Sequence, residues 1–260
     1  DFSPGQLTPQ KAETSQIAFY KTIPCLRNLK IIRNAYAIEY DCFNSIQMYP
    51  TLEFKNVSGL FSGGQSNGSS GYEEAACQGL MAGINASLKL KGQSPLILKR
   101  NEAYIGVLID DLVTKETHEP YRMMTSRAEY RLLLRQDNAD IRLRRKGYEV
   151  GLISQEEMDA LELKELQIGE EIKRLSNTYV GTSKEVQELL EQYESTPLKS
   201  GTTLEELIKR PELDYAKLAP LDPERPALSE SVTEQVTIHI KYDGYIKRQM
   251  KQVEQFKKFE

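Results

Sequence analysis

The sequence of 260 residues contains no tryptophan, two histidines and three cysteines, and each scarcity excludes a class of site. His118 and His239 are far apart and have no flanking cluster of ligands, so we predict no metal site. Cys25, Cys42 and Cys77 are odd in number and lack CxxC spacing, which argues against a disulfide framework or a zinc centre. They are expected to be reduced thiols in a cytoplasmic protein.

Long apolar segments and a large excess of one charge are also missing. No apolar run approaches the roughly 20 residues that span a bilayer, and no signal peptide is visible, so we predict no membrane partner. The formal net charge is −4, so any surface that binds nucleic acid must be local. The dinucleotide fingerprint GxGxxG and the phosphate-binding pattern GxxxxGKS/T are both absent.

The first part of the chain mixes helical and extended patterns. It begins at Asp1 rather than methionine and stops inside a helical pattern, so we expect a piece of a longer protein. A short helix is predicted at 16–23 and a strand at 31–41, where β-favouring residues gather. An extended stretch at 52–61 leads into a glycine-rich loop, and a helix is predicted at 72–90. This order is typical of an α/β ligand-binding segment.

Beyond Gly151 the sequence becomes helical in character. Spacings of the form S/T-x-x-E can cap a helix reciprocally, and four of them in about eighty residues indicate successive helices. They are Ser154–Glu157, Thr182–Glu185, Thr203–Glu206 and Ser231–Glu234. Val186, Leu189, Leu190 and Tyr193 have the spacing of a buried helix face. Residues 236–242, VTIHIKY, alternate like a strand in a helical setting, so the two signals conflict there.

Residues 63–86, GGQSNGSSGYEEAACQGLMAGINA, begin as a glycine-rich loop and end as a helix of small residues. Glycine lets a ligand approach the backbone, and the hydroxyl and amide side chains supply uncharged donors. The helix that follows points its free amides back at the loop. We therefore predict a ligand site formed by Gly64, Gln65, Asn67, Gly68, Ser69, Gly71 and Tyr72. The alternative is a flexible surface loop before an ordinary amphipathic helix.

The predicted helix at 72–90 carries a row of small residues next to a row of large apolar residues. Two interior glycines cost about 1 kcal/mol each relative to alanine, so a close-packed partner, a sheet or a cofactor, is expected. The small residues are Ala75, Gly79, Gly83 and Ala86, and the neighbouring row expected to face the core is Leu80, Ile84 and Leu88.

A basic segment follows Pro120. Ser126 and Glu129 have capping-box spacing, and they predict a helix that carries arginines on one face at every fourth position. Guanidinium groups suit phosphate, so we predict a nucleic-acid contact formed by Arg122, Arg127, Arg131 and Arg135. In the alternative interpretation the arginines pair internally with the nearby carboxylates of Asp110, Asp111, Asp137 and Asp140.

The stretch GLFSGGQSNGSSGYEEAACQGLMAGINA, residues 59–86, closely resembles the signature of the MnmG (GidA) family. The members are flavin-dependent enzymes that modify the wobble uridine of certain tRNAs. The likeness continues through 102–143 and, more loosely, through KYDGYIKRQ at 241–249. It implies the C-terminal part of an FAD-binding α/β (Rossmann-like) domain followed by a mostly α-helical domain, an α+β chain overall. We predict boundaries at 1–94, 95–150 and 151–260, the middle segment being a connection with the basic helix.

The resemblance also implies a reaction and its participants. The family uses FAD, methylenetetrahydrofolate and ammonium or glycine, with NADH as a reductant and the GTPase MnmE as partner, to build an aminomethyl or carboxymethylaminomethyl group on tRNA. A homodimer is implied as well, and the residue that matches Gln65 contacts FAD in the family. The family's GxGxxG and the segments with its two catalytic cysteines are absent, so no residue is assigned a catalytic role. The chain alone is expected to be inactive.

Two other functions remain open from the sequence. One is a non-catalytic helical module that binds RNA or a partner protein. The other is a relative of the folate- and flavin-dependent tRNA uridine methyltransferases, whose glycine loop is similar. The glutamate pair Glu73–Glu74 and the long helical part after Gly151 favour the MnmG side.

Overall fold

The structure is a computed structural model that describes residues 13–34, 41–69, 71–115 and 120–256. Its contacts divide the chain into two units, Asp1–Phe43 and Asn44–Glu260, and each is described by itself.

The first unit contains a short helix, α1 (Glu13–Lys21), and a 3-10 turn, η2 (Pro24–Leu26). The helix expected at 16–23 therefore exists, three residues earlier at its start and two at its end. Residues 31–34 and 41 are not extended into a strand, and residues 35–40 of the predicted strand lie outside the described part.

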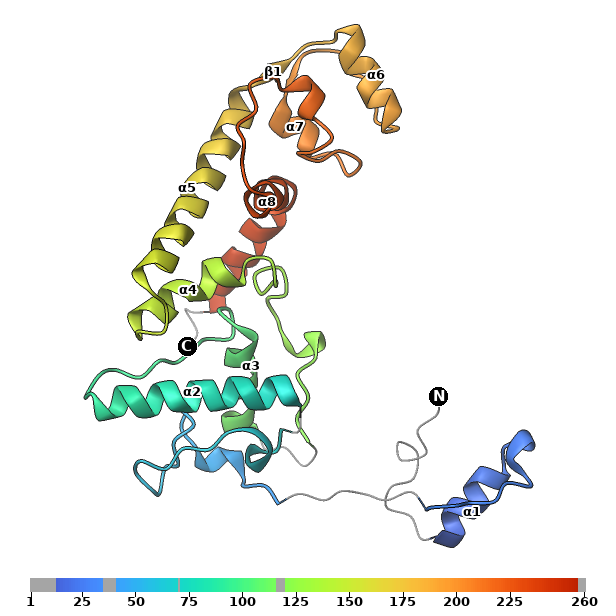
Figure 1. Cartoon of the computed structure of the whole chain (residues 1–260), viewed down its shortest axis with the longest axis vertical. Coiled ribbons are helices and arrows are strands. Elements are labelled where there is room, and N and C mark those ends of the chain that lie inside the picture. Colours follow the sequence, from blue (N-terminus) through green and yellow to red (C-terminus); the bar gives the residue numbers. More distant parts are fainter. Residues whose placement is uncertain (1–12, 35–40, 70, 116–119, 257–260) are drawn as a thin grey trace. The chain divides into compact units, whose positions relative to one another are not determined.

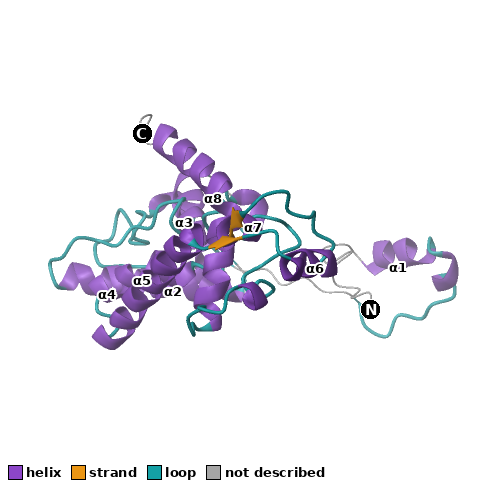
Figure 2. Cartoon of the chain, turned by 90° about the horizontal axis from the view of Figure 1, so that it is seen from above, coloured by secondary structure: helices purple, strands orange, loops and turns teal. Residues whose placement is uncertain are grey.

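The second unit is mostly helical, with one short sheet in its described residues (Figure 2). The longer helices are α2 (Tyr72–Leu90), α3 (Tyr104–Thr114), α4 (Ala139–Glu149), α5 (Gln155–Asn177), α6 (Lys184–Gln192), α7 (Leu204–Ile208) and α8 (Glu230–Phe256). The sheet joins β1 (Tyr179–Val180) to β2 (Thr202–Thr203) in antiparallel register. Mixed helical and extended structure agrees with the predicted α+β class.

The part of this unit that precedes α4 packs around α2 and α3. The segment before them folds back on itself through two isolated bridges, Met48 with Phe54 and Glu53 with Phe61, where a longer extended stretch was predicted. The 3-10 turns η3 (Ser45–Gln47) and η4 (Gly64–Asn67) flank this segment. The core beneath is formed by Met48, Leu52, Phe54, Met81, Ala82, Leu108, Ile109, Leu112, Val113 and Tyr121.

The helix α2 has the predicted bounds; its glycines Gly79 and Gly83 are exposed, and Ala75 and Ala86 are half-buried. A Cβ added at Gly79 or Gly83 would meet nothing within 4 Å. The buried face is made instead by Gln78, Met81, Ala82, Asn85 and Leu88. The described residues leave Gly79 and Gly83 exposed, so the expectation of a close-packed partner, a sheet or a cofactor, stays a prediction. Leu80, expected at the core, is 55% exposed. Of its predicted row, Leu88 is buried and Ile84 is half-buried.

The part that follows is a helical assembly in which α5 packs against α8, α4 and α7 (Figure 1). Its core confirms the predicted buried face of α6, because Val186, Leu189 and Leu190 all lie in it. Four residues around α7 complete the centre and are fully buried: Leu204, Leu207, Ile208 and Leu213. VTIHIKY lies inside α8, so the helical setting outweighs the alternation of its residues.

The predicted caps differ in their outcome. Ser154 forms a complete capping box with Glu157, and the Thr203 hydroxyl accepts a hydrogen bond from the backbone nitrogen of Glu206. The cap of α6 is Ser183 rather than Thr182. The last helix starts at Glu230, so Ser231 lies inside α8 and does not cap it.

Replacing Ser154 with alanine is expected to lower the free energy of unfolding by about 1 kcal/mol, because the amide of Glu157 loses its acceptor. Chemical denaturation followed by circular dichroism measures this change. Ser231→Ala serves as the matched control and should not destabilise the chain, because alanine is a better helix former than serine inside a helix. Equal losses in both variants would contradict the assignment of these two helix starts.

Candidate functional site

The glycine loop folds back on the first turns of α2. The Gln78 side-chain oxygen accepts hydrogen bonds from the Gly64 backbone nitrogen and from Asn67 Nδ2, both at 3.0 Å. Asn67 Nδ2 also donates to the Ser62 carbonyl at 2.9 Å. A Cβ at Gly63 would lie 3.0 Å from the backbone nitrogen of Gly79, so the loop touches the helix backbone directly. Two buried amide side chains thus fix the shape of the loop.

Glycine is required at particular points of this loop. Gly64 and Gly68 have φ values of 82° and 78°, in the left-handed region that side chains disfavour. A Cβ at Gly71 would lie 1.7 Å from Glu74 Oε2, so the carboxylate occupies the space of a side chain. The glycines serve the backbone path as well as any ligand.

The segment around Tyr121 holds the other side of the loop. The Tyr121 backbone nitrogen donates to the Gly68 carbonyl at 2.7 Å, and Ser69 forms a parallel bridge with Tyr121. Two residues later, the Met123 nitrogen donates to Glu74 Oε1 at 3.0 Å. This bond is the main reason why the pKa of the Glu74 carboxyl lies below its ordinary value. The loop is therefore enclosed between the start of α2 and residues 121–123.

The predicted cofactor residues fall into two groups. Gln65 and Tyr72 are exposed, Tyr72 to 93% of its area, and Gly68 is half-buried. The buried group is Gly64, Asn67, Ser69 and Gly71. Asn67 donates within the protein to Ser62 and Gln78, so its amide group shapes the loop. The seven residues follow one another from η4 to the first residue of α2. Their role toward a cofactor stays a prediction.

Three buried polar atoms of the loop region lack a hydrogen-bond partner among the described residues: Asn67 Oδ1, Ser69 Oγ and Gln78 Nε2. Their residues are at most 1% exposed. Buried polar groups in proteins are nearly always satisfied, so these atoms call for a partner that the described residues do not supply, an ordered water or a ligand group. Uncharged donors and acceptors in this number fit the carbonyls and ring nitrogens of a flavin. No metal-ligating group of three or more His, Cys, Asp or Glu is found in the described ranges.

An ionic network around the buried carboxylate of Asp111 supports the loop through Tyr121. The Tyr121 hydroxyl donates to Asp111 Oδ2 at 2.9 Å, and Arg100 and Lys115 both reach Asp111 Oδ1 at 2.7 Å. Burial and the bond to Asp111 both raise the pKa of the Tyr121 hydroxyl. Sequence reasoning missed Arg100 and the buried role of Tyr121. The signal available was the acidic pair at the end of an apolar helix, which needs a cation.

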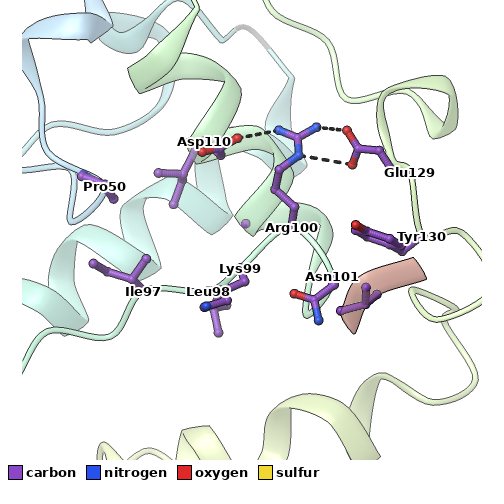
Figure 3. A pocket seen from close by; sticks show the side chains of 12 residues that line it. Pro50, Ile97, Leu98, Lys99, Arg100, Asn101, Asp110, Glu129 and Tyr130 are labelled. Carbon is purple, nitrogen blue, oxygen red and sulfur yellow. Dashed lines mark hydrogen bonds and ion pairs between the residues drawn. The ribbon is translucent and has the colours of Figure 1, made fainter. Parts of the chain in front are cut away.

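Arg100 also connects α3 to the basic segment. Its guanidinium lies between Asp110, at 2.8 Å, and Glu129, at 2.6 Å (Figure 3). Beside it is a cavity of about 440 Å³ whose walls include Ile97, Asn101 and Tyr130 (Figure 3). Three carboxylates around one guanidinium raise the pKa of Arg100 even though burial opposes this. The arrangement holds two segments together.

The arginine-bearing helix predicted from Ser126 does not form. A 3-10 turn, η5 (Thr125–Arg127), is followed by turns, and the next helix, α4, begins at Ala139. The predicted capping glutamate, Glu129, binds Arg100 instead of closing a helix turn. The side chain that the local pattern assigns to a cap is therefore used in a tertiary contact.

The four predicted nucleic-acid arginines consequently do not share one helix face. Arg135 pairs with Asp137, its Nε 3.0 Å from Oδ1, so the internal-pairing alternative holds there. The guanidinium of Arg127 stacks 4.4 Å from the centre of the Tyr121 ring. Arg122 and Arg131 are exposed. Asp111 and Asp140 take other partners, Arg100 and Lys164.

The remaining groups singled out in the sequence are simpler. The three cysteines are free and exposed. Desolvation, with the charges of Glu74 and Glu73, raises the pKa of the Cys77 thiol, so it is not an activated nucleophile. Within the described residues, no helix has the length and apolar character needed to traverse a bilayer.

Comparison with known proteins places the chain in a family. The family model for glucose inhibited division protein A matches residues 5–94, and the model for the tRNA modifying enzyme MnmG/GidA C-terminal helical domain matches residues 155–250. The chain belongs to the MnmG/GidA family. The tRNA uridine 5-carboxymethylaminomethyl modification enzyme MnmG of Lachnoclostridium phytofermentans is 65% identical to it over 248 residues. The enzyme of the same name from Clostridium kluyveri is 61% identical over 248 residues.

Solved structures agree with this membership. Aquifex aeolicus GidA in its form II crystal superposes with a TM-score of 0.77 at 40% identity, over 95% of this chain and 39% of that one. Its form I crystal gives 0.75 at the same identity, over 95% and 38%. The match covers 95% of this chain but only 40% of each of the two MnmG relatives named above. The α+β class expected from the resemblance is confirmed by these MnmG/GidA neighbours.

Proposed function

We propose that this chain is the part of an FAD-dependent tRNA-modifying enzyme that holds the flavin-ring side of the cofactor site. The observation that carries the proposal is the cluster of unsatisfied buried atoms, Asn67 Oδ1, Ser69 Oγ and Gln78 Nε2, under a loop with an exposed glutamine. When bound, FAD supplies the redox chemistry of the family. The chain supplies binding and orientation.

Each part of the loop has a distinct role in this proposal. The bare backbone at Gly64 and Gly68 lets a flat ring approach, and Gln65 offers an amide at the exposed side. The start of α2 carries no side-chain cap at Gly71, and the Glu74 carboxylate lies against it, held by the Met123 nitrogen. Asn67 and Gln78 keep this surface in place before the cofactor arrives.

The whole enzyme is proposed to build an aminomethyl or carboxymethylaminomethyl group on C5 of the wobble uridine of tRNA. It would act with the GTPase MnmE as a homodimer and consume methylenetetrahydrofolate and ammonium or glycine, with NADH as reductant. The names of the relatives and the match to the C-terminal helical domain of the family support MnmG over a methyltransferase. Because the chain spans about 40% of those relatives, it is proposed to be inactive alone.

The division into 1–94, 95–150 and 151–260 remains part of this proposal. The family models stop at residue 94 and resume at residue 155, which supports two of its three segments. The middle segment then holds α3, the Arg100 network and α4, and it connects the flavin loop to the helical part.

Replacing Gln65 with alanine in the full-length enzyme is expected to weaken FAD binding roughly three- to tenfold, the value of one lost hydrogen bond. The Gln65 side chain is exposed, so the fold and thermal unfolding should not change. Titration of the apoprotein with FAD, followed by flavin fluorescence, measures the affinity.

Gln192→Ala is the matched control, since Gln192 is an exposed glutamine at the end of α6. It should bind FAD like the wild type. Unchanged affinity in the Gln65 variant would remove this residue from the site. Failure of the wild-type full-length enzyme to bind FAD would contradict the proposed function itself.

A further inference from the structure

The exposed side of α8 carries two neighbouring tyrosines. Tyr242 and Tyr245 are 43% and 54% exposed, and their ring centroids are 6.4 Å apart. The guanidinium of Arg248 lies 4.8 Å from the centre of the Tyr245 ring. Adjacent aromatic rings left in water beside a guanidinium form a surface on which flat groups can stack.

The basic segment after α3 is hydrogen-bonded to α8 at one position before these tyrosines and at one position after them. Gln249 accepts a hydrogen bond from the Leu133 nitrogen at 3.1 Å, and Gln235 Nε2 donates to Asp137 Oδ2 at 2.9 Å. The two glutamines are 14 residues apart, which is about 21 Å along a helix. Positions 242, 245 and 249 follow one another at three- and four-residue spacing, so they share one helix face. Along α8, the tyrosines thus lie between the two hydrogen-bonded glutamines.

The charge of this surface is opposite to that of the chain. Residues 241–251 contain four basic side chains and one acidic one, a local net charge of +3, whereas the whole chain carries −4. Lys247 pairs with the acidic residue, Asp243, at 2.8 Å. Arg131, in the segment bound to α8, is exposed. A local positive field with aromatic rings is complementary to a phosphate chain that carries bases.

Unpaired RNA fits this surface better than duplex RNA. Bases in a duplex are stacked on each other, and only those of loops and bulges are available to stack on aromatic side chains. A protein partner could also use tyrosine and arginine, which are enriched at protein interfaces, whereas lysine is depleted there, so the test below separates the two kinds of partner. Here one cation, the guanidinium of Arg248, lies against the Tyr245 ring.

We propose that Tyr242 and Tyr245 stack on unpaired bases of the RNA substrate, while Arg131 and Arg248 contact its phosphates. This inference rests on the proposed function, because it takes RNA as the substrate, and it places the RNA surface on α8 in addition to the predicted arginines. The occupant is a single-stranded loop of RNA.

The test measures the affinity of the 260-residue chain for a labelled RNA stem-loop and for the same stem as a blunt duplex. The double variant Tyr242→Ala, Tyr245→Ala should bind the stem-loop roughly tenfold or more weakly, while duplex binding changes little. The double variant Tyr242→Phe, Tyr245→Phe keeps the rings and should bind like the wild type. The salt dependence should not change in either, because no phosphate contact is removed.

Tyr179→Ala is the matched control, since Tyr179 lies on β1, is 75% exposed and is remote in sequence from the basic residues. A second readout uses the absence of tryptophan from the chain. Tyr245→Trp introduces a unique fluorophore whose emission should be quenched when a base of the stem-loop stacks on it. Circular dichroism of each variant confirms that α8 is retained.

Several results would overturn the inference. They are equal stem-loop affinity of the alanine variant and the wild type, an equal loss of affinity in the phenylalanine variant, and no RNA affinity in the wild type. None of these concerns the flavin loop. Conversely, a full-length enzyme that fails to bind FAD would contradict the proposed function without altering the response of the tyrosines to RNA.

Discussion

Replacing Arg174 with methionine should lower the free energy of unfolding by about 3–5 kcal/mol, because it leaves two buried carboxylates without a positively charged partner. The guanidinium binds Glu171, with Nη2 2.7 Å from Oε1, and Asp222, with Nη1 2.9 Å from Oδ1. These carboxylates belong to side chains that are 3% and 5% exposed. Methionine retains part of the stem's packing but none of the positive charge. Urea denaturation followed by circular dichroism gives the free energy.

The source of this loss can be separated from a change in packing. Adding Glu171→Gln and Asp222→Asn to the methionine variant removes the uncompensated charges and should restore part of the stability. Lys184→Met removes an exposed pair with Glu188 and should change the free energy little. If Arg174→Met and Lys184→Met unfold at the same urea concentration, the buried triad does not stabilise the helical part.

The elements that local chemistry determines were predictable from the sequence. The bounds of α2 follow from a glycine-rich approach and a run of helix-favouring residues, and both ends are confirmed. The capping box at Ser154 forms because both of its partners lie within one helix turn. The buried face of α6 follows from the spacing of its apolar residues.

The failures arise where a distant residue decides the local structure. The Ser126–Glu129 spacing matches a capping box, but Arg100, 29 residues away from Glu129, takes the carboxylate. In the row of α2 predicted to face the core, Leu88 is buried but Leu80 is exposed. The burial of Gln78 and Asn85 was not predicted, because it depends on hydrogen bonds that no hydropathy pattern reveals. For the same reason the Tyr121–Asp111–Arg100 network was not predicted.

Replacing Asp111 with alanine is expected to cost about 3 kcal/mol and to loosen the glycine loop. The change leaves the buried hydroxyl of Tyr121 without its acceptor and removes one carboxylate from Arg100. Tyr121 also holds the loop through its bond to the Gly68 carbonyl, so the amides of 63–71 should exchange hydrogen faster. Asp110→Ala is the control, since Asp110 is 44% exposed and binds Arg100 from the outside. Hydrogen exchange in the loop should remain at the wild-type rate in that variant.

The dependence of this stability on pH follows from the ionisation of Asp111. Burial alone would raise the pKa of its carboxyl, but the bonds from Lys115, Arg100 and Tyr121 outweigh burial and lower it. A depressed folded pKa means that the contribution is present above the unfolded value of about 4 and disappears as the pH falls through the folded value. The stability difference between the wild type and Asp111→Asn should therefore be constant near neutral pH and narrow below about pH 4. If the stability difference between the wild type and Asp111→Asn grew on acidification, it would contradict a lowered pKa of Asp111 in the folded state.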